Sequence, residues 1–162
     1  MKSLVAIGLF CLTLCAKAQV SYGDLFLVNY NMKIHVITEN DSAFLYVVFT
    51  SEKNKINDTP KLLLRLMDDS IISLDGILLD SHIKSEGGVT VGSAYVANNH
   101  YVSEVKFPIS KRDILHFQKG IRKLRLNTSP KYHEKEWRKD RIGHTLYLAY
   151  LNSSTNSFED DF

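Results

Sequence analysis

The sequence has 162 residues, and a hydrophobic fraction of 44% is enough for one folded domain with a sizeable core. The 20 Lys and Arg residues nearly balance the 18 Asp and Glu residues, so the composition gives no reason to expect a nucleic-acid partner. Beyond the first residues, no stretch is apolar for long enough to predict a membrane-spanning helix.

The first eighteen residues have the features of a secretory signal peptide. Lys2 precedes the apolar run Leu4–Leu14, and Ala16-Lys17-Ala18 forms an A-x-A cleavage pattern before Gln19. Both cysteines of the chain lie inside this segment, so the mature protein is predicted to have no disulfide and no thiolate metal site. We therefore expect an exported protein, periplasmic or extracellular, with about 144 residues and a formal charge near zero.

The first part of the mature chain predicts β-strands. Tyr30–Thr38 alternates apolar and polar residues, whereas Ala43–Thr50 is apolar on both faces, which indicates a central strand with something packed on each side. Lys61–Met67 aligns three leucines on one face. The turn Asp68-Asp69-Ser70 then leads into Ile71–Leu74, which predicts a hairpin.

Further turn signals divide the middle of the chain. Asp75-Gly76 predicts one turn, and the glycine-rich Ser85–Gly88 opens a strand over Val89–Ala97 that we expect to be bulged. Asn98-Asn99-His100 is a second turn signal, and it leads into a strand over Tyr101–Phe107. The pattern therefore predicts two short strands here rather than one long strand.

The last part of the chain mixes element types. Ser110 followed by Asp113 predicts the start of a short helix that ends at Gly120. Ile121–Thr128 predicts a strand with its leucines inward. A final helix is expected from Tyr132 to Tyr150, with Gly143 as a weak point inside it.

Together these elements predict one β-rich domain over residues 19–151, and the polar and acidic segment 152–162 is expected to be a disordered tail. Many short strands without regular strand–helix alternation argue against a parallel α/β fold. The predicted architecture is an immunoglobulin-like antiparallel β-sandwich with a short helical insert and a C-terminal helix.

The C-terminal part of the chain has a recognisable pattern. A strand ending "FPIS" is followed by a short helix, the stretch "GIRKLRLNTSP", an expected charged helix with "KDRIG" and an aromatic-rich end. These features cover about 45 residues, Lys106–Leu151, and resemble small exported proteins of Bacteroidetes. The resemblance implies a Gram-negative exported protein, and it brings no activity, cofactor or catalytic residue.

The stretch "HEKEW", residues 133–137, begins like the zinc-protease signature His-Glu-x-x-His and then departs from it. Trp137 stands where the second histidine should be, so His133 has no partner on its helix face. The six histidines of the chain are scattered, and no two have metal-ligand spacing. We therefore interpret this stretch as the solvated first turn of the final helix, with Trp137 toward the core.

Other pairs with catalytic residue types are also incomplete. Asp140 and His144 are four residues apart and could form half of a catalytic triad, but no nucleophile motif accompanies them. Asp68 and Asp69 are adjacent and fit a turn better than a pair of glycosidase carboxylates. No catalytic residue, metal site or cofactor is predicted.

Charge is distributed unevenly along the chain. Residues 106–141 contain twelve basic and four acidic side chains, whereas residues 19–105 contain six basic and eleven acidic ones. A concentrated basic face would attract an anionic glycan, lipopolysaccharide or an acidic protein surface. The candidate ligand-binding residues of this face are Lys123, Arg125, Lys135, Arg138, Lys139 and Arg141.

These observations favour a non-enzymatic binding or scaffold protein of the bacterial envelope. A small periplasmic hydrolase, with a site assembled from distant residues such as His133, Asp140 and His144, is the alternative, and it predicts a concave pocket that gathers them. A subunit of a surface assembly is a third possibility, and it predicts an exposed sheet edge that can accept another strand.

Overall fold

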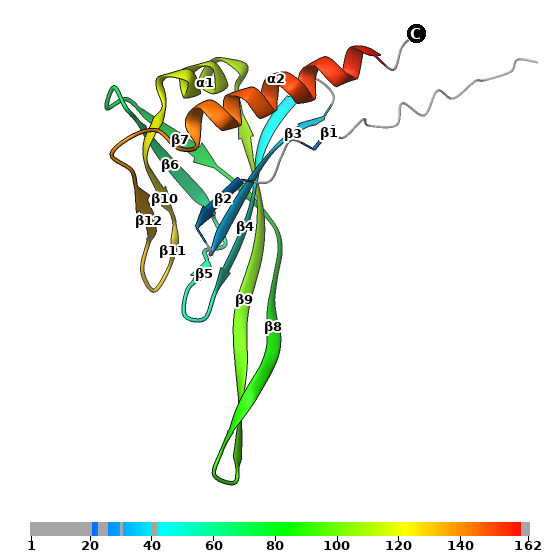
Figure 1. Ribbon diagram of the computed structural model, residues 1–162, viewed down its shortest axis with the longest axis vertical. Coiled ribbons are helices and arrows are strands. Elements are labelled where there is room, and N and C mark those ends of the chain that lie inside the picture. Colours follow the sequence, from blue (N-terminus) through cyan, green and yellow to red (C-terminus); the bar gives the residue numbers. More distant parts are fainter. Residues whose placement is uncertain (1–20, 23–25, 30, 40–41, 160–162) are drawn as a thin grey trace, which may run out of the picture.

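The computed structural model describes residues 21–22, 26–29, 31–39 and 42–159 of the chain. The predicted signal peptide lies outside these residues. Antiparallel β-strands dominate the described residues, and they form two sheets with one shared core and a small separate strand pair. Two helices and one 3₁₀ turn complete this part of the chain. Figure 1 shows the two sheets side by side, with a long hairpin that projects away from them.

The larger sheet has the strand order β1-β3-β4-β9-β8, and β2 also pairs with β3. All of its pairs are antiparallel. Its strands are β1 (Ser21–Tyr22), β2 (Phe26–Asn29), β3 (Met32–Glu39), β4 (Ser42–Ser51), β8 (Ile77–Val91) and β9 (Ala94–Ile109).

The smaller sheet has the strand order β12-β10-β6-β7 and is also antiparallel, and a separate pair joins β11 to β5. The chain crosses from the smaller to the larger sheet between β7 and β8. The strands are β5 (Lys55–Ile56), β6 (Lys61–Leu66), β7 (Ile71–Asp75), β10 (Ile121–Leu126), β11 (Thr128–Ser129) and β12 (His133–Glu136).

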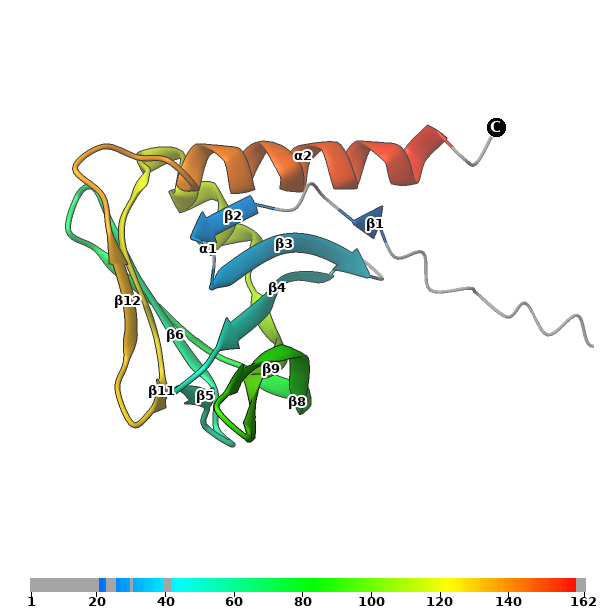
Figure 2. The ribbon, with the colours of Figure 1, turned by 60° about the horizontal axis from the view of Figure 1, so that its bottom comes forward.

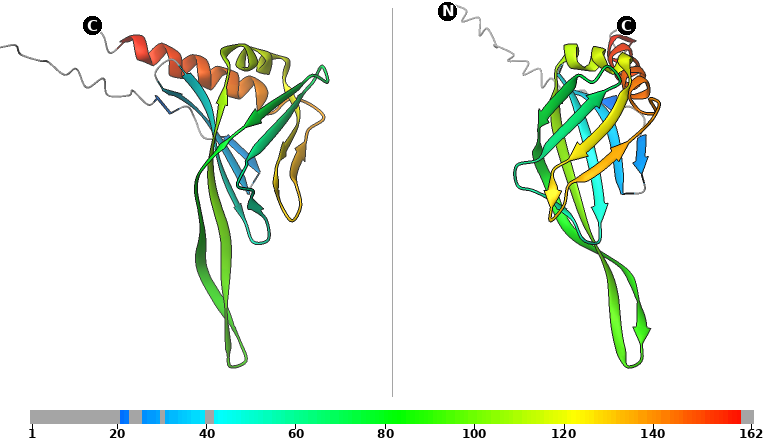
Figure 3. Two further views of the ribbon diagram at one scale, coloured as in Figure 1. Left: turned by 180° about the vertical axis from the view of Figure 1, so that it is seen from behind. Right: turned by 90° about the vertical axis from the view of Figure 1, so that its left-hand side faces the viewer.

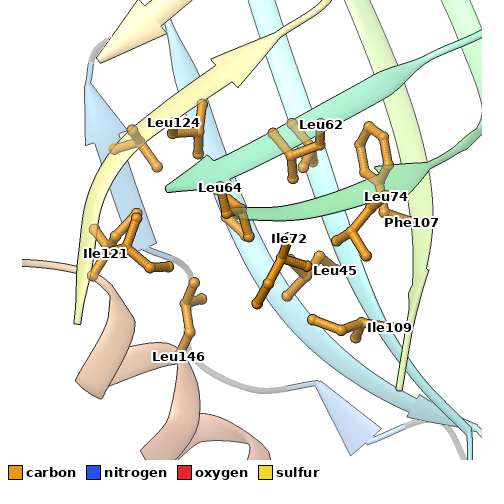
Figure 4. Close-up of a cluster of buried hydrophobic side chains, with 14 of the residues drawn as sticks. Leu45, Leu62, Leu64, Ile72, Leu74, Phe107, Ile109, Ile121, Leu124 and Leu146 are labelled. Carbon is orange, nitrogen blue, oxygen red and sulfur yellow. The ribbon is translucent and has the colours of Figure 1, made fainter. Parts of the chain in front are cut away.

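The core lies between the two sheets (Figure 4). Strict alternation along β4 and β6 turns one side of each strand inward, so that the inward side chains are buried. β10 alternates in the same way from Lys123 to Leu126, after an irregularity between Ile121 and Lys123. Leu64 of the smaller sheet and Leu45 and Phe107 of the larger sheet all have no exposed surface. Gly76 lies where the chain crosses between the sheets, and an added Cβ there would stand 2.6 Å from the Phe107 ring.

The short helix confirms the sequence prediction. α1 (Lys111–His116) begins after Ser110, whose hydroxyl oxygen accepts a hydrogen bond of 3.0 Å from the backbone N–H of Asp113. The 3₁₀ turn η1 (Phe117–Lys119) follows, and Gly120 ends it with a φ of 82°. Only a glycine adopts this backbone conformation readily.

The final helix differs from its predicted extent at both ends. α2 (Gly143–Glu159) begins at the glycine that was expected to interrupt it, and the preceding segment forms strand β12. The period-two alternation of His133–Glu136 explains this difference, because it places Glu134 opposite Arg125 and Glu136 opposite Lys123. The helix also continues to Glu159, through most of the segment 152–162 that was predicted to be a disordered tail.

α2 packs against β3, β1 and the turn η1, and it covers one end of the space between the sheets (Figure 2). Leu146 and Ala149 are its buried contacts with the core. Among the described residues, no helix is both long enough and apolar enough to cross a membrane.

Among the residues that the structure describes, no second layer covers the outer face of β4, in contrast to the prediction. Phe44, Tyr46 and Val48 are half-buried on this face. The ammonium group of Lys106 lies 3.9 Å from the centre of the Phe44 ring and is also paired with Glu39. The long side chains of neighbouring strands therefore shield the apolar residues of this face. The sequence pattern of a strand face shielded in this way is the same as that of a face covered by a second layer.

The predicted turn at Asn98-Asn99-His100 is also wrong, because β9 continues through it without a break. Asn99 lies opposite Ser85 of β8, and the Ser85 hydroxyl donates a 2.6 Å hydrogen bond to the Asn99 side-chain oxygen. Cross-strand pairing thus overrides the local preference of these residues for a turn. The true turn is Gly92-Ser93, which lies inside the predicted strand Val89–Ala97. The bulge lies before that strand, between Ser85 and Gly88, in the glycine-rich segment that was expected to open it.

Replacing Phe107 with Ala should destabilise the protein strongly, because it leaves a cavity between the two sheets beside Gly76. We expect the free energy of unfolding to fall by about 3–5 kcal/mol, measured by urea denaturation of the chain from Gln19 onward. Tyr95→Ala is the matched control, because Tyr95 lies in the same strand but is exposed. A loss of less than about 1 kcal/mol for Phe107→Ala would contradict this packing.

Candidate functional site

The feature with the clearest functional character is the projecting hairpin of β8 and β9. We call its outer part, residues 79–99, the arm. Figure 3 shows from two sides that the arm extends well beyond both sheets. Every residue of the arm is exposed, so it contributes nothing to the core. An isolated two-stranded hairpin is marginally stable in water at best, so the arm has little stability of its own.

The tip of the arm carries apolar side chains on both faces. Val89 is opposite Val96 and Val91 is opposite Ala94, which places these four side chains on one face. The exposed fractions are 65% for Val89, 64% for Val91 and 54% for Val96. Tyr95 is 65% exposed on the other face. These side chains thus keep more than half of their surface in contact with water.

Charge is confined to the base of the arm. Asp80 contacts His82 at 2.7 Å, and the Lys84 ammonium group contacts the Glu86 carboxylate at 2.6 Å. The Lys84 partner lowers the pKa of Glu86. From Gly87 to Asn99 no residue is charged. The arm therefore has a polar base and an uncharged tip rich in β-branched residues, which is the composition of a strand that pairs readily.

The structure separates the six residues of the predicted basic face. Lys123 and Arg125 do face outward from β10, as predicted, but both contact the same carboxylate, that of Glu134 on β12. The hydrogen bond from Lys123 and the contact with Arg125 lower the pKa of Glu134. One carboxylate thus compensates half of the charge of this pair of cations.

The other four residues lie elsewhere. Lys135 is opposite the inward-facing Leu124, so it projects to the other side of the sheet from Arg125. Arg138, Lys139 and Arg141 lie in the loop between β12 and α2, and all three are exposed. Within the described part of the chain, these four side chains make no ion pair.

Arg122 is a residue of this region that the sequence pattern did not single out. Its guanidinium lies 3.2 Å from a carboxylate oxygen of Asp69 and 3.6 Å from one of Glu136. It lines a shallow pocket together with Met67, Glu136, Trp137 and Arg138. Only tertiary pairing of the β6–β7 turn with β10 brings these groups together, so no local signal could have found them.

The near-match to the zinc-protease signature has no catalytic geometry. His133 lies on strand β12 rather than on a helix, and its ring packs edge-on against Phe49 with the ring centres 4.9 Å apart. Burial lowers the pKa of His133 and so favours its neutral form. Within the described residues, no group of three or more His, Cys, Asp and Glu side chains could hold a metal ion.

Asp140 and His144 do not form half of a triad. The Asp140 carboxylate accepts hydrogen bonds from the backbone N–H groups of Ile142, Gly143 and His144 at the start of α2, at 3.2, 2.8 and 2.9 Å. It accepts a fourth, of 2.9 Å, from Ile121 at the start of β10. Asp140 therefore caps the helix and ties it to the smaller sheet.

These bonds decide the ionisation of Asp140. Partial burial alone would raise its pKa, but the four backbone N–H groups more than compensate, and its pKa is lowered. Gly120 and Gly143 make this arrangement possible, because a Cβ at either position would stand 3.0 Å or less from side-chain atoms of Asp140. The group is a structural carboxylate held in its charged form.

The comparisons with known proteins add no functional assignment. No protein-family model matches the sequence, no curated protein is similar to it, and no solved structure matches its fold. The function must therefore be inferred from the geometry of the arm and of the charged surface.

The role of Asp140 predicts a specific pH dependence. Because its folded pKa lies below the ordinary value, its ionised form stabilises the protein above about pH 4, and this contribution disappears as the pH falls through the folded pKa. Asp140→Ala should lower the free energy of unfolding at pH 7 by about 1–2 kcal/mol, measured by urea denaturation.

The matched control is Asp140→Asn, which can still cap the helix but cannot ionise. Its stability should approach that of the natural protein as the pH is lowered toward 3, because the natural carboxylate then becomes protonated. A stability difference between the two proteins that is constant from pH 7 to pH 3 would contradict this role.

Proposed function

We propose that the chain is an exported, non-enzymatic binding or scaffold protein of the bacterial envelope, and that the arm is its binding element. The observation that carries this proposal is the exposure of the whole segment 79–99, with valine and tyrosine side chains in water. Ordering such a segment costs conformational entropy that its own burial does not offset. A partner that covers the tip would supply the missing burial.

The way in which the arm joins the body supports the same proposal. β9 pairs with β4 from Ala43 opposite Ile109 to Ser51 opposite Tyr101, and the same strand then continues into the arm. Val105 and Phe107 anchor it in the core with no exposed surface. The body therefore holds the arm in a fixed direction, as a scaffold for presentation of the tip would require.

We also propose that the protein is exported to a Gram-negative envelope and that its fold is an immunoglobulin-like sandwich. The predicted signal peptide supports export, and the resemblance of Lys106–Leu151 to exported proteins of Bacteroidetes supports a Gram-negative envelope. Two antiparallel sheets with one core between them support an immunoglobulin-like sandwich.

A second candidate function is binding of an anionic surface, such as lipopolysaccharide, by the loop before α2. The specific observation is that Arg138, Lys139 and Arg141 are exposed and make no ion pair with a described residue. Lys123 and Arg125, by contrast, already share Glu134. A hydrolase is less well supported, because the His133 ring packs against Phe49 and the Asp140 carboxylate already accepts four backbone hydrogen bonds.

The first test shortens the arm. Replacing Lys84–His100 with Asn-Gly joins Ile83 to Tyr101, which are directly opposite each other, through a two-residue hairpin turn. We expect the body to keep its stability within about 1 kcal/mol, because the removed residues lie outside the core. Cross-linking of the tagged protein in the envelope of the producing cells should lose its main products.

The matched control for this test is Lys123→Ala with Arg125→Ala, which changes the outer face of the smaller sheet and leaves the arm intact. Its cross-linked products should be those of the natural protein. If the protein with the shortened arm gives the same products, the arm is not the binding element.

The second test separates the two groups of basic residues. Arg138→Ala, Lys139→Ala and Arg141→Ala together should weaken binding to lipopolysaccharide, because each basic side chain near an anionic surface contributes about 1 kcal/mol. Lys123→Ala with Arg125→Ala should have a smaller effect, because these cations are already paired. Affinity would be measured by titration at low and physiological salt, and equal effects of both changes would contradict the assignment to the loop.

A further inference from the structure

The two edges of the arm differ in how well they are protected against strand pairing. The free edge of β8 carries charged residues at Asp80, Lys84 and Glu86, and it has a bulge between Ser85 and Gly88. Charges and bulges are the devices by which proteins block edge-to-edge association. This edge is therefore unsuited to pairing with another strand.

The free edge of β9 has neither device. β4 ends at Ser51, opposite Tyr101, so within the described residues β9 has no strand on its second side from Ala94 to His100. This segment contains no Asp, Glu, Lys or Arg. At the bulge the extra residue belongs to β8, because Glu86 and Gly87 lie against the single residue Asn98 of β9. Seven consecutive residues of the strand without the insertion thus present an uncharged row of backbone donors and acceptors.

A lipid bilayer does not fit this edge. Unpaired backbone N–H and C=O groups are not tolerated in the hydrocarbon region, and a two-stranded hairpin has two open edges. The partner of the arm must therefore offer backbone groups of its own. Another uncharged strand edge is the best partner for this edge, because pairing the two brings no like charges together.

We propose that this partner is a second copy of the same chain, paired antiparallel through Ala94–His100. The inference rests on the proposed role of the arm as the binding element. The register that pairs the whole free segment is centred on Ala97, so Ala97 faces its own copy and Val96 faces Asn98 of the second copy. The two arms then form a four-stranded sheet with β9 strands at its centre, which exceeds the minimum for a stable small sheet.

The same pairing doubles the apolar face of the tip. Val89, Val91 and Val96 of each copy lie on one side of the combined sheet. An interface confined to one strand edge and its side chains falls at the small end of interface sizes, below about 1,200 Å². The dimer is therefore reversible and depends on concentration, with the two-fold symmetry typical of soluble dimers.

The decisive experiment uses two variants of the chain from Gln19 onward that differ only in the sign of one charge. Val96→Lys with Asn98→Lys places two cations opposite each other in both symmetric positions. Val96→Glu with Asn98→Lys changes the same two residues but places opposite charges there. Sedimentation velocity over a range of concentrations measures the dissociation constant of each dimer.

We expect the natural chain to dimerise, the first variant to dimerise roughly tenfold more weakly or not at all, and the second to recover most of the affinity. Both variants remove the same valine, so loss of apolar surface cannot explain a difference between them. Equal dissociation constants for the two variants, or a dimer that persists after the arm is shortened, would overturn the proposed pairing.

A second measurement tests the register directly. Cys11 and Cys15 are the only cysteines of the chain and precede Gln19, so an introduced cysteine has no competitor. Ala97→Cys should form a disulfide between two copies on mild oxidation, because directly opposed residues of paired strands lie close enough for one. Ser85→Cys, on the opposite edge of the arm, is the control and should form no disulfide between copies.

The outcomes also distinguish this inference from the proposed function. A natural chain that stays monomeric at all concentrations overturns the inference, while arm-dependent cross-linking to a different envelope protein would leave the proposed function standing. Arm-dependent flotation of a monomer with vesicles of phosphatidylcholine and phosphatidylglycerol would replace the second copy by a lipid surface. Cross-linked products that do not depend on the arm would overturn both.

Discussion

The constraint on which the rest of the structure depends is that one strand, β9, belongs to both the core and the arm. Val105 and Phe107 are buried between the sheets, and the same alternation continues outward to Tyr95 at the tip. Its hydrogen-bonded register with β4 fixes the rotation of the strand, because a shift by one residue would turn Phe107 toward solvent. The core therefore determines which side chains each face of the arm displays.

Several basic side chains of the chain form ion pairs with acidic side chains that lie close to them in the fold. The sequence shows a strongly basic stretch after an acidic one, but the fold pairs Lys119 with Asp68 and Arg122 with Asp69 across elements about fifty residues apart. Lys123 and Arg125 share Glu134 on the adjacent strand. Of the six residues of the predicted basic face, Lys135 on β12 and three residues of the following loop keep no ion pair with a described residue. The net charge of a segment therefore overstates the field that a ligand would experience.

Sequence patterns predicted the elements whose local and tertiary preferences agree. The alternating leucines of Lys61–Leu66 and the Ser110 cap of α1 appear as expected. The patterns failed where tertiary pairing wins: β12 forms because Glu134 and Glu136 lie opposite basic residues, and β9 passes through Asn98-Asn99-His100 because β8 pairs with it. The arm could not be foreseen, since its exposure depends on β4 ending at Ser51, which no residue of the arm encodes.

The arm also differs from neighbouring parts of the fold in how its exposed edge and apolar side chains are protected. On the outer face of β4, Phe44 is shielded by Lys106, and the free edge of β8 is protected by charges and a bulge. The edge of β9 and the valines of the tip have neither form of protection, although one lysine in either strand would supply it. An unprotected edge on a rigid support, in a protein that protects its other edge, is the arrangement expected where pairing is the purpose of the edge.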